Sequence, residues 1–400
     1  MKVVIIGNGL AGTMAAKTMR ELDTEVEVLI FAEERYPYYP RPNLIEYVAG
    51  KMPYERVFAF SEGWHVRQKI DIRLGFPVRK IHPRSREIEL EEGRRESYDR
   101  LLIANGSSSF IPPIKGADKR GVFSLRTLDD AQAILDYLQG HRQVVVIGGG
   151  LLGLEIARAI RSRGAEVEVV EFFDRLLPRQ LDVQGASLLR SQIESQGIRI
   201  RLGVATEEIL GAGEMKGLRL KGGHEVNGDM AVFAAGVRPN LGLPQDAGLA
   251  TDRGLVVDDR LRTSHPQVFA AGDSIQHRGK VYGIIPASFE QARTAAYNLM
   301  GEDKKYEGTV PANTLKVVGL EVTSVGLVNP EGEGFEEVRK FKKEEGIYKK
   351  IVLQDGALVG AIWMGTKKGV NEIASAVTAK AKISQWITSL LDDSFDFSVL

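Results

Sequence analysis

The sequence predicts an α/β fold with two Rossmann-like dinucleotide-binding domains and a small C-terminal α+β domain. Three observations support this prediction. An apolar strand, a glycine-rich turn, a helix and a second strand occur at residues 2–31, and the same pattern returns at residues 143–170. After about residue 314 the pattern changes to short apolar runs separated by glycine turns. Because 400 residues are too many for one ordinary hydrophobic core, several domains are expected.

The first unit is a predicted β–α–β segment with a turn of spacing Gly-x-Gly-x-x-Gly. Its elements are a strand at 2–6, a helix at 11–22 and a strand at 25–31. The turn and the helix start contain Gly7, Gly9, Leu10, Ala11 and Gly12. In this pattern the first glycine allows a sharp turn, the second lets a pyrophosphate touch the backbone, and the third lets helix and strand pack closely. Glu33, 21 residues after Gly12, has the spacing of an acid that binds ribose hydroxyl groups.

The second unit repeats this arrangement. Its elements are a strand at 143–147, a helix at 152–163 and a strand at 166–170. The turn and the helix start contain Gly148, Gly150, Leu152 and Gly153. Backbone N–H groups at such a helix start hold phosphates. Glu171, 18 residues after Gly153, is the predicted ribose acid, and its charge would repel a 2′-phosphate. We therefore expect NADH rather than NADPH, although Arg175 could reverse this preference.

Two linkers mark crossings between domains. Residues 106–116 are rich in Ser, Pro and Gly, and residues 236–240 follow the second unit. The first dinucleotide-binding domain is therefore expected at 1–112 and 241–313, the second at 113–240, and the C-terminal domain at 314–400. The first domain should also contain strands at 71–74, 87–90 and 101–103, a buried strand at 268–273 that ends in Asp273, and a helix at 286–300.

The C-terminal domain is expected to contain strands within 315–327, 348–353 and 357–363, followed by a helix at about 371–391. Apolar residues of that helix form a stripe at 373, 377, 383, 386, 387, 390 and 391. The stripe predicts packing on the helix's own domain or on a second subunit, which would make an oligomer. A contact with a membrane or with an acceptor protein is the alternative. Residues 392–400 are expected to be loosely ordered.

Composition excludes several kinds of chemistry. The chain contains no cysteine, so it supplies no disulfide, redox-active thiol or thiolate-bound cluster. Its formal net charge is zero, which does not indicate binding to nucleic acid or anionic lipid. The six histidines show no metal-ligand spacing, so no metal site is expected. The apolar N-terminal run leads straight into the glycine turn and is interpreted as a strand, not a signal peptide. No apolar run approaches the ~20 residues that span a bilayer, and a cytoplasmic location is expected.

Taken in order, these motifs resemble those of the pyridine nucleotide–disulfide oxidoreductase superfamily. The resemblance covers about residues 1–320 and includes both glycine turns with their acids. Three further matching segments lie at 102–106, 233–240 and 268–273. The resemblance implies that the first domain binds FAD and that the inserted second domain binds NADH. It also implies that Asp273 hydrogen-bonds the ribityl chain of FAD, although the same acid could simply cap a helix.

Residues 38–44 and 47–50 are similar to those of NADH–rubredoxin reductases, ferredoxin reductases and the flavin part of assimilatory nitrite reductases. The C-terminal strands at 348–363 are similar to the small third domain of this group. The resemblance implies further cofactor contacts at Arg41, Pro42, Val78, Ala104, Asn105, Gly106, Arg126, Gly236, Gly272 and Ile285.

The sequence departs from these relatives at three positions. Asn43 stands where related enzymes carry a flavin-facing cysteine, and Asn105 stands where the family usually has threonine. Glu46 replaces a lysine that in related reductases pairs with the acid equivalent to Glu155. Two carboxylates held close together would share a proton, so Glu46 and Glu155 are tentative catalytic residues that tune the flavin. Alternatively, Glu46 faces solvent and Glu155 only stabilises the first turn of its helix.

The resemblance implies a flavoprotein that passes electrons from NADH through FAD to a small acidic iron–sulfur protein such as rubredoxin or ferredoxin. Exposed lysines would favour such a partner, and the candidates are Lys342, Lys343, Lys349, Lys350, Lys367 and Lys368. The alternatives are a type II dehydrogenase that reduces quinone, an NADH-responsive redox sensor similar to apoptosis-inducing factor, and a component reductase that serves an oxygenase or a nitrite reductase.

Overall fold

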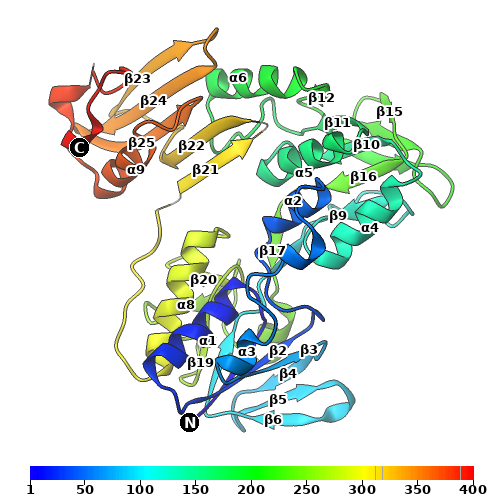
Figure 1. Ribbon diagram of the computed structural model, residues 1–400, viewed down its shortest axis with the longest axis vertical. Coiled ribbons are helices and arrows are strands. Elements are labelled where there is room, and N and C mark those ends of the chain that lie inside the picture. Colours follow the sequence, from blue (N-terminus) through cyan, green and yellow to red (C-terminus); the bar gives the residue numbers. More distant parts are fainter. Residues whose placement is uncertain (311, 318, 388) are drawn as a thin grey trace. The chain divides into compact units, whose positions relative to one another are not determined.

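The computed structural model describes residues 1–310, 312–317, 319–387 and 389–400, and its chain divides into two compact units (Figure 1). Unit 1 contains Met1–Tyr47, Met52–Ser108 and Val237–Thr309. Unit 2 contains Val48–Lys51, Ser109–Gly236 and Val310–Leu400. The first glycine turn thus belongs to unit 1, and the second belongs to unit 2 together with the C-terminal domain. The domain boundaries expected from the sequence stay predictions.

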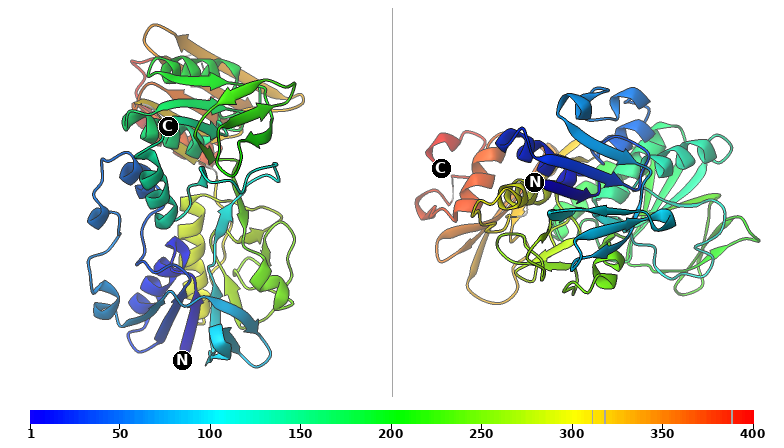
Figure 2. Two further views of the ribbon diagram at one scale, coloured as in Figure 1. Left: turned by 90° about the vertical axis from the view of Figure 1, so that its right-hand side faces the viewer. Right: turned by 90° about the horizontal axis from the view of Figure 1, so that it is seen from below.

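A parallel sheet forms the centre of unit 1. Its strand order is β19 (Val268–Ala270), β7 (Arg100–Ile103), β1 (Lys2–Ile6), β2 (Glu27–Ala32) and β3 (Ile70–Leu74). Helices α1 (Leu10–Leu22) and α8 (Ile285–Leu299) pack against each other beside this sheet (Figure 2). Residues 3–6 of β1 are all buried, as expected for a parallel strand covered on both faces.

Beside β1, the order of the strands in the sheet differs from their order along the chain. This switch point is where the first glycine turn lies. The chain runs from β1 to β2 on one side, whereas the much later β7 pairs with β1 on the other side. Ligands of open α/β sheets bind outside the carboxyl ends of the strands at such a switch point. Gly7 follows β1 there, and Ala104 follows β7.

A small antiparallel sheet, short strands and short helices make up the other elements of unit 1. A three-stranded antiparallel sheet contains β4 (Val78–His82), β5 (Glu87–Leu90) and β6 (Arg95–Ser97). The short strands are β8 (Ser107–Ser109), β17 (Val237–Pro239), β18 (Leu255–Val257) and β20 (Ile275–His277). The short helices are α2 (Asn43–Val48), α3 (Trp64–Arg67), α7 (Gly242–Asp246) and the 3₁₀ turns Tyr54–Arg56 and Glu91–Gly93. Of these elements, α2 and β8 end in unit 2.

Unit 2 contains a second parallel sheet with the same kind of switch point. Its order is β12 (Ile198–Arg201), β11 (Glu166–Val170), β10 (Gln143–Ile147), β16 (Met230–Phe233) and β9 (Val122–Ser124). The accompanying helices are α4 (Leu128–Leu138), α5 (Leu151–Ser162) and α6 (Val183–Glu194). A small antiparallel sheet contains β13 (Thr206–Leu210), β14 (Gly217–Leu220) and β15 (Glu225–Asn227). Gly148 follows β10 where β11 and β16 flank it, which matches Gly7 in unit 1.

The described residues of the C-terminal domain of unit 2 form an antiparallel sheet and helix α9 (Val370–Ala379). The strand order is β21 (Ala312–Val317), β22 (Leu320–Gly326), β25 (Ala357–Met364), β24 (Ile347–Gln354) and β23 (Phe335–Lys342). Helix α9 packs on β22 and β25, and 3₁₀ turns follow at Ser384–Trp386 and Phe397–Val399.

The final helix is shorter than the sequence predicts. It ends at Ala379, and Lys380 adopts a left-handed conformation with φ +50° that turns the chain back. Lys382 then pairs with Ala357 next to the sheet. The stripe residues of 371–391 pack within the core of the C-terminal domain. The apolar pattern therefore came from packing of an irregular segment on its own domain, the first of the two expectations.

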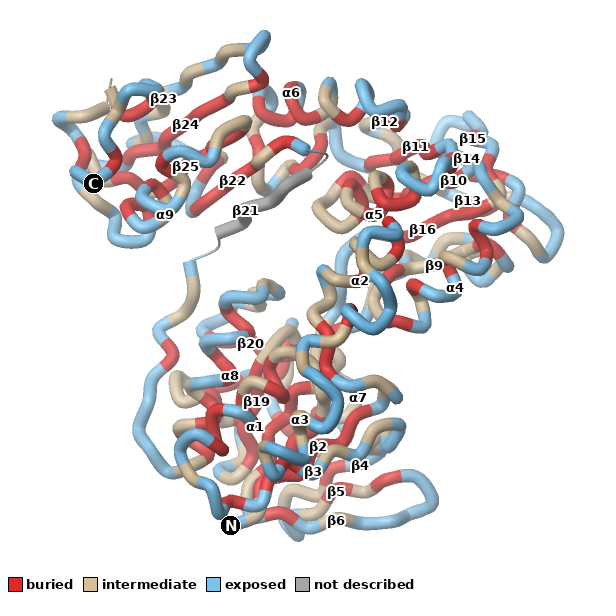
Figure 3. Tube along the Cα trace, in the orientation of Figure 1, coloured by how far each residue is buried: buried red, intermediate tan, exposed pale blue. Residues whose placement is uncertain are grey.

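The last nine residues are also better ordered than expected. Phe397 is buried, and its ring packs edge-on against the ring of Trp363, with 5.9 Å between the centroids. Figure 3 shows buried segments in this part of the chain. Apolar side chains at the chain end are held because they complete the core beside α9. In the part of the chain that the structure describes, no helix is both long and apolar enough to cross a membrane.

Candidate functional site

Two glycines of each turn are required by the fold itself. Gly7 has φ +108°, and a Cβ there would lie 2.3 Å from the carbonyl oxygen of Ala104. A Cβ on Gly12 would lie 1.9 Å from the carbonyl oxygen of Gly7. Gly148 and Gly153 repeat both close approaches in unit 2. These four residues let helix, turn and strand meet without side chains between them.

Gly9 and Gly150 have no such structural reason. Their φ angles are −77° and −78°, which any residue adopts, and they precede α1 and α5. A Cβ on either would meet no atom of the described chain within 4 Å. The space beside each backbone is therefore open at the helix start, and it fits a group that must touch the backbone, such as a pyrophosphate.

The starts of α1 and α5 also lack side-chain caps among the described residues, and neither has an acid in its first turn. Two other helices of unit 2 are capped, whereas α9 is not: Thr127 and Asp130 form a capping box on α4, and Asp182 caps α6. Uncapped N–H groups and the helix dipole attract an anion. Leu10 and Ala11 in unit 1, and Leu152 in unit 2, lie in these open first turns.

The two predicted ribose acids lie in different surroundings. Glu33 directly follows β2 and is exposed. Glu171 directly follows β11, is only 6% exposed, and accepts hydrogen bonds from the N–H groups of Gly149 and Phe173. The carboxylate of Glu171 is thus fixed beside the second glycine turn, in a suitable place to accept ribose hydroxyl groups.

Two aromatic residues beside Glu171 escaped the sequence analysis. The side chains of Phe172 and Phe173 are 68% and 51% exposed, unusually high for large apolar groups. The available signal was their position directly after the ribose acid. Exposed aromatic faces there are suited to cover an adenine ring.

Asp273 is held in place within unit 1 by two serines. Its carboxylate accepts hydrogen bonds from Ser107 Oγ at 3.0 Å and Ser288 Oγ at 3.4 Å. Ser288 lies in the first turns of α8, whose start carries the half-exposed Ile285 and no side-chain cap in the described structure. Gly272, which precedes Asp273, has φ +93° and lies close to Ala11 in α1. The acid therefore lies near an open helix start instead of capping it.

The side-chain amide of Asn105 binds the linker at residues 236–240. Its Nδ2 donates to the carbonyl of Asn240 at 2.9 Å, and Asn240 Nδ2 donates to the carbonyl of Asn105 at 2.7 Å. The Asn240 N–H also donates to the carbonyl of Gly106. A threonine would lack the amide donor. Asn105 Oδ1 is buried without a partner among the described residues, which leaves an acceptor for a bound group.

Arg41 is engaged locally by an acid and a phenol. Its guanidinium donates to Glu34 and to Tyr39 Oη, and Tyr39 donates to Glu34. Burial alone would lower the pKa of Arg41, but hydrogen bonds to Glu34 raise that pKa above its ordinary value. Pro42 beside it is exposed, and Val78 begins β4 opposite Leu90.

The remaining predicted residues are distributed over both units. Asn43 Nδ2 donates to the carbonyl of Val57 at 2.9 Å, so this replacement for cysteine has a structural role. Glu46 on α2 belongs to unit 1 and Glu155 on α5 to unit 2, and both are half-buried. Their pairing stays a prediction. So do the cofactor contacts of Arg126 and Gly236, which belong to unit 2.

Two of the candidate docking lysines are not on the surface. Lys349 and Lys350 are each 1% exposed. Lys349 Nζ donates to the carbonyl of Leu391 and to Asp393, while Lys350 Nζ binds Glu337 and Asp182. Adjacent strand residues point to opposite faces, and both faces of β24 are covered. The expectation that this pair is exposed was wrong.

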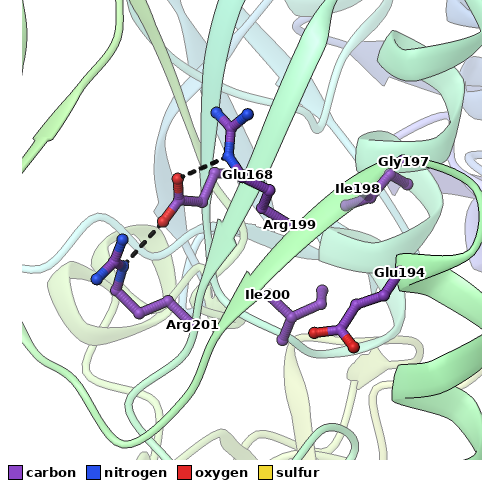
Figure 4. Close-up of a pocket in the computed structure, with 7 residues that line it drawn as sticks. All are labelled: Glu168, Glu194, Gly197, Ile198, Arg199, Ile200 and Arg201. Atoms are coloured by element: carbon purple, nitrogen blue, oxygen red, sulfur yellow. Dashed lines mark hydrogen bonds and ion pairs between the residues drawn. The ribbon is translucent and has the colours of Figure 1, made fainter.

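A surface pocket of about 510 Å³ lies at the edge strand β12 (Figure 4). Glu168 lies between Arg199 and Arg201 there and accepts hydrogen bonds from both, at 3.1 and 2.8 Å. None of the residues predicted to bind a cofactor lines this pocket.

Comparison with known proteins identifies this pair of glycine-turn sheets. Residues 1–297 match the family model described as pyridine nucleotide-disulphide oxidoreductase. The chain belongs to the pyridine nucleotide-disulphide oxidoreductase family. Residues 311–381 match the rubredoxin NAD⁺ reductase C-terminal domain. The predicted fold class, with two Rossmann-like domains and a C-terminal α+β domain, is therefore confirmed.

Relatives with several names share this family fold. Nitrite reductase [NAD(P)H] of Bacillus subtilis is 36% identical over 96% of this chain and 48% of its own length. NADH-rubredoxin oxidoreductase of Clostridium acetobutylicum is 30% identical over 92% of this chain and 93% of its own length. The crystal structure of a ferredoxin reductase from Rhodopseudomonas palustris has a TM-score of 0.90 at 26% identity and covers 100% of this chain and 99% of its own.

Family membership establishes the general chemistry. The chain has the fold of a family of FAD- and NAD(P)H-dependent oxidoreductases, whose cofactors are FAD and NADH. It has no cysteine and hence no redox-active thiol. The chain spans about half the length of the nitrite reductase relatives that it matches.

Proposed function

We propose that this chain passes electrons from NADH through FAD to a small iron–sulfur protein of the rubredoxin or ferredoxin type. The observation that carries the proposal is the rubredoxin NAD⁺ reductase C-terminal domain at residues 311–381, which follows two dinucleotide folds without a cysteine. No cysteine of this chain can relay the electrons, so the proposal has the reduced flavin pass them to an acceptor other than a thiol. The match along 93% of an NADH-rubredoxin oxidoreductase supports the same acceptor class.

The residues of the chain then have separate binding roles. The open starts of α1 and α5 hold the pyrophosphates of FAD and NADH. Glu33 and Glu171 accept hydrogen bonds from ribose hydroxyl groups, and Asp273, fixed by two serines, accepts them from the ribityl chain. The bound flavin itself supplies hydride acceptance and electron release. Glu46 and Glu155 stay proposed tuning residues. If the flavin potential of Glu46→Gln equals that of the unaltered enzyme at every pH between 6 and 9, Glu46 does not tune the flavin.

An acceptor panel tests the proposal. The FAD-loaded enzyme is mixed anaerobically with NADH and rubredoxin, a [2Fe–2S] ferredoxin, ferricyanide, menadione or, separately, oxygen. We expect efficient reduction of an iron–sulfur protein and of ferricyanide. Turnover with menadione alone would favour the quinone alternative. Negligible turnover with every acceptor, together with a long-lived NADH complex, would favour the redox sensor.

A component of a nitrite reductase is the second candidate. It is favoured by the 36% identity over 96% of this chain to a protein about twice as long. In that case the partner would be a nitrite-reducing module, on the same chain or another. Nitrite reduction after addition of such a module, compared with rubredoxin reduction, separates the two candidates. The cytoplasmic location and an oligomer through the C-terminal domain stay predictions.

A further inference from the structure

One loop contacts the second glycine turn. This nucleotide loop, defined as residues 172–181, follows Glu171 and leads into α6. Its Leu177 N–H donates to the carbonyl of Gly149, and Leu176 is so close that a Cβ on Gly149 would lie 2.8 Å from its Cδ2. The loop therefore determines where the Gly149 backbone and the Glu171 carboxylate lie.

Within the nucleotide loop, the N–H groups of Gln180 and Leu181 both donate to the carbonyl of Leu177. Leu177 is buried and has φ +48°, a backbone conformation that leucine adopts only when its surroundings impose it. Nothing about the identity of this residue favours that conformation. Contacts from outside the loop, such as the bond from the Leu177 N–H to Gly149, add to its internal hydrogen bonds.

The C-terminal domain provides further contacts of this kind. Asn329 Nδ2 donates to two loop carbonyls, Pro178 at 3.2 Å and Leu181 at 3.1 Å. Tyr348 Oη donates to Asp182 Oδ2 at 2.5 Å, directly after the loop, where Asp182 caps α6. Both partners come from residues that are distant in sequence but lie in the same unit.

The supporting residues are themselves firmly held. The Lys350 ammonium lies 3.4 Å from Asp182 and 2.9 Å from Glu337, and it donates to the carbonyl of Val328 next to Asn329. On α6, a Cβ on Gly185 would lie only 3.3 Å from the Tyr348 ring. α6 therefore packs closely on β24, as Figure 1 shows.

We propose that Asn329 and Tyr348 are positioning residues for NADH. They hold the nucleotide loop in the strained shape that places Gly149 and Glu171 for coenzyme binding. The inference rests on the proposed binding of NADH at the second glycine turn. It gives the C-terminal domain a role in coenzyme affinity, separate from any contact with the electron acceptor.

The test compares two variants with a matched control in the full-length, FAD-loaded enzyme. Asn329→Ala removes both carbonyl contacts, and Tyr348→Phe removes only the hydroxyl group. Asn371→Ala, at an exposed position on α9, is the control. Loss of one or two hydrogen bonds should raise the KM for NADH about threefold to tenfold, with kcat for ferricyanide within about twofold. Amide exchange at 172–181 should become faster in both variants without NADH.

The outcomes are distinguishable from failure of the proposed function. If both variants lower the melting temperature but keep the KM for NADH within about twofold of the unaltered enzyme, the contacts serve stability only and the inference is wrong. If NADH does not protect the amides of 148–153 in the unaltered enzyme, the coenzyme site is misplaced and the inference falls with it. Ferricyanide serves as acceptor throughout, so the identity of the iron–sulfur partner does not affect the result.

Discussion

At the scale of single residues, the glycines of each turn divide into two groups. Gly7, Gly12, Gly148 and Gly153 are needed by the protein, because a Cβ would overlap a backbone carbonyl. Gly9 and Gly150 are needed only if something binds beside them. This contrast separates folding from binding within one motif.

A methyl group at either open glycine should therefore block its ligand and leave the fold intact. We expect Gly9→Ala to weaken FAD binding, and Gly150→Ala to weaken NADH binding, by about tenfold or more, because hydrogen bonds to a charged phosphate are lost. The helix-start cost of alanine is about 1 kcal/mol or less. Equilibrium dialysis of FAD and the KM for NADH measure the effects. The controls Gly242→Ala and Gly140→Ala also add a Cβ in open space and should bind normally.

Coenzyme choice is also decided at one residue. We expect the unaltered enzyme to prefer NADH, because a 2′-phosphate would approach the Glu171 carboxylate. Glu171→Ala should raise the KM for NADH about tenfold and change the KM for NADPH much less. Steady-state assays with both coenzymes measure this, with Glu166→Ala at the exposed start of β11 as the control. An unchanged coenzyme preference in Glu171→Ala would contradict the assignment.

At the scale of elements, α6 is held by an acid that should make the protein sensitive to low pH. Burial alone would raise the pKa of Asp182, but hydrogen bonds from Tyr348 and from the Gly185 N–H outweigh it, so the pKa of Asp182 lies below its ordinary value. A folded-state pKa below the unfolded one means that this stabilisation is present above about pH 4 and is lost as the pH falls further.

Comparison of the variant Asp182→Asn with the unaltered enzyme isolates the contribution of the Asp182 charge. Asp182→Asn should melt at a lower temperature than the unaltered enzyme at about pH 6, and the gap should shrink toward about pH 3. Calorimetry across this range measures it. The exposed Asp246→Asn should show no comparable change. A gap that stays constant with pH would mean that Asp182 acts through packing and not through its charge.

The chain end provides a second prediction at this scale. Phe397→Ala should lower the free energy of unfolding of the C-terminal domain by about 3 kcal/mol or more, because it leaves a cavity beside Trp363. Urea titration followed by tryptophan fluorescence measures this. Val399→Ala, at a side chain that is 47% exposed, is the control and should change stability by less than about 0.5 kcal/mol. Equal stability of both variants would mean that the tail does not complete the core.

At the scale of the whole molecule, charge is largely neutralised within the chain. The formal net charge is zero. Lys342, Lys349 and Lys368 all donate to Asp393, and hydrogen bonds from Lys342 and Lys349 hold the pKa of Asp393 well below its usual range. These contacts tie the three lysines to the C-terminal tail, although Lys368 stays exposed.

We accordingly expect acceptor reduction to depend little on salt. The stopped-flow rate of rubredoxin reduction should change less than about threefold between low salt and about 0.3 M. A steep decline would reveal electrostatic docking on other basic residues, and Lys343→Glu and Lys367→Glu, both at exposed positions, would then locate it.

Local patterns predicted much of the fold because they have local causes. Each glycine turn, with its flanking strands and helix, lies within about 30 residues of continuous sequence, and the sequence shows it directly. The final helix was predicted too long, because an apolar periodicity records burial and not backbone geometry. The turn at Lys380 has no comparable sequence signal.

The sequence by itself determined that this protein has two dinucleotide folds, acids at ribose spacing and no thiol chemistry, since each follows from residue types at short, fixed separations. Only the tertiary structure decided that Lys349 and Lys350 are buried, that the tail completes a core, and that Asn329 and Tyr348 support the loop behind Glu171. These outcomes depend on which surfaces meet between segments that are separated by tens of residues or, for Tyr348 and Asp182, by 166 residues, and no local pattern records such a meeting.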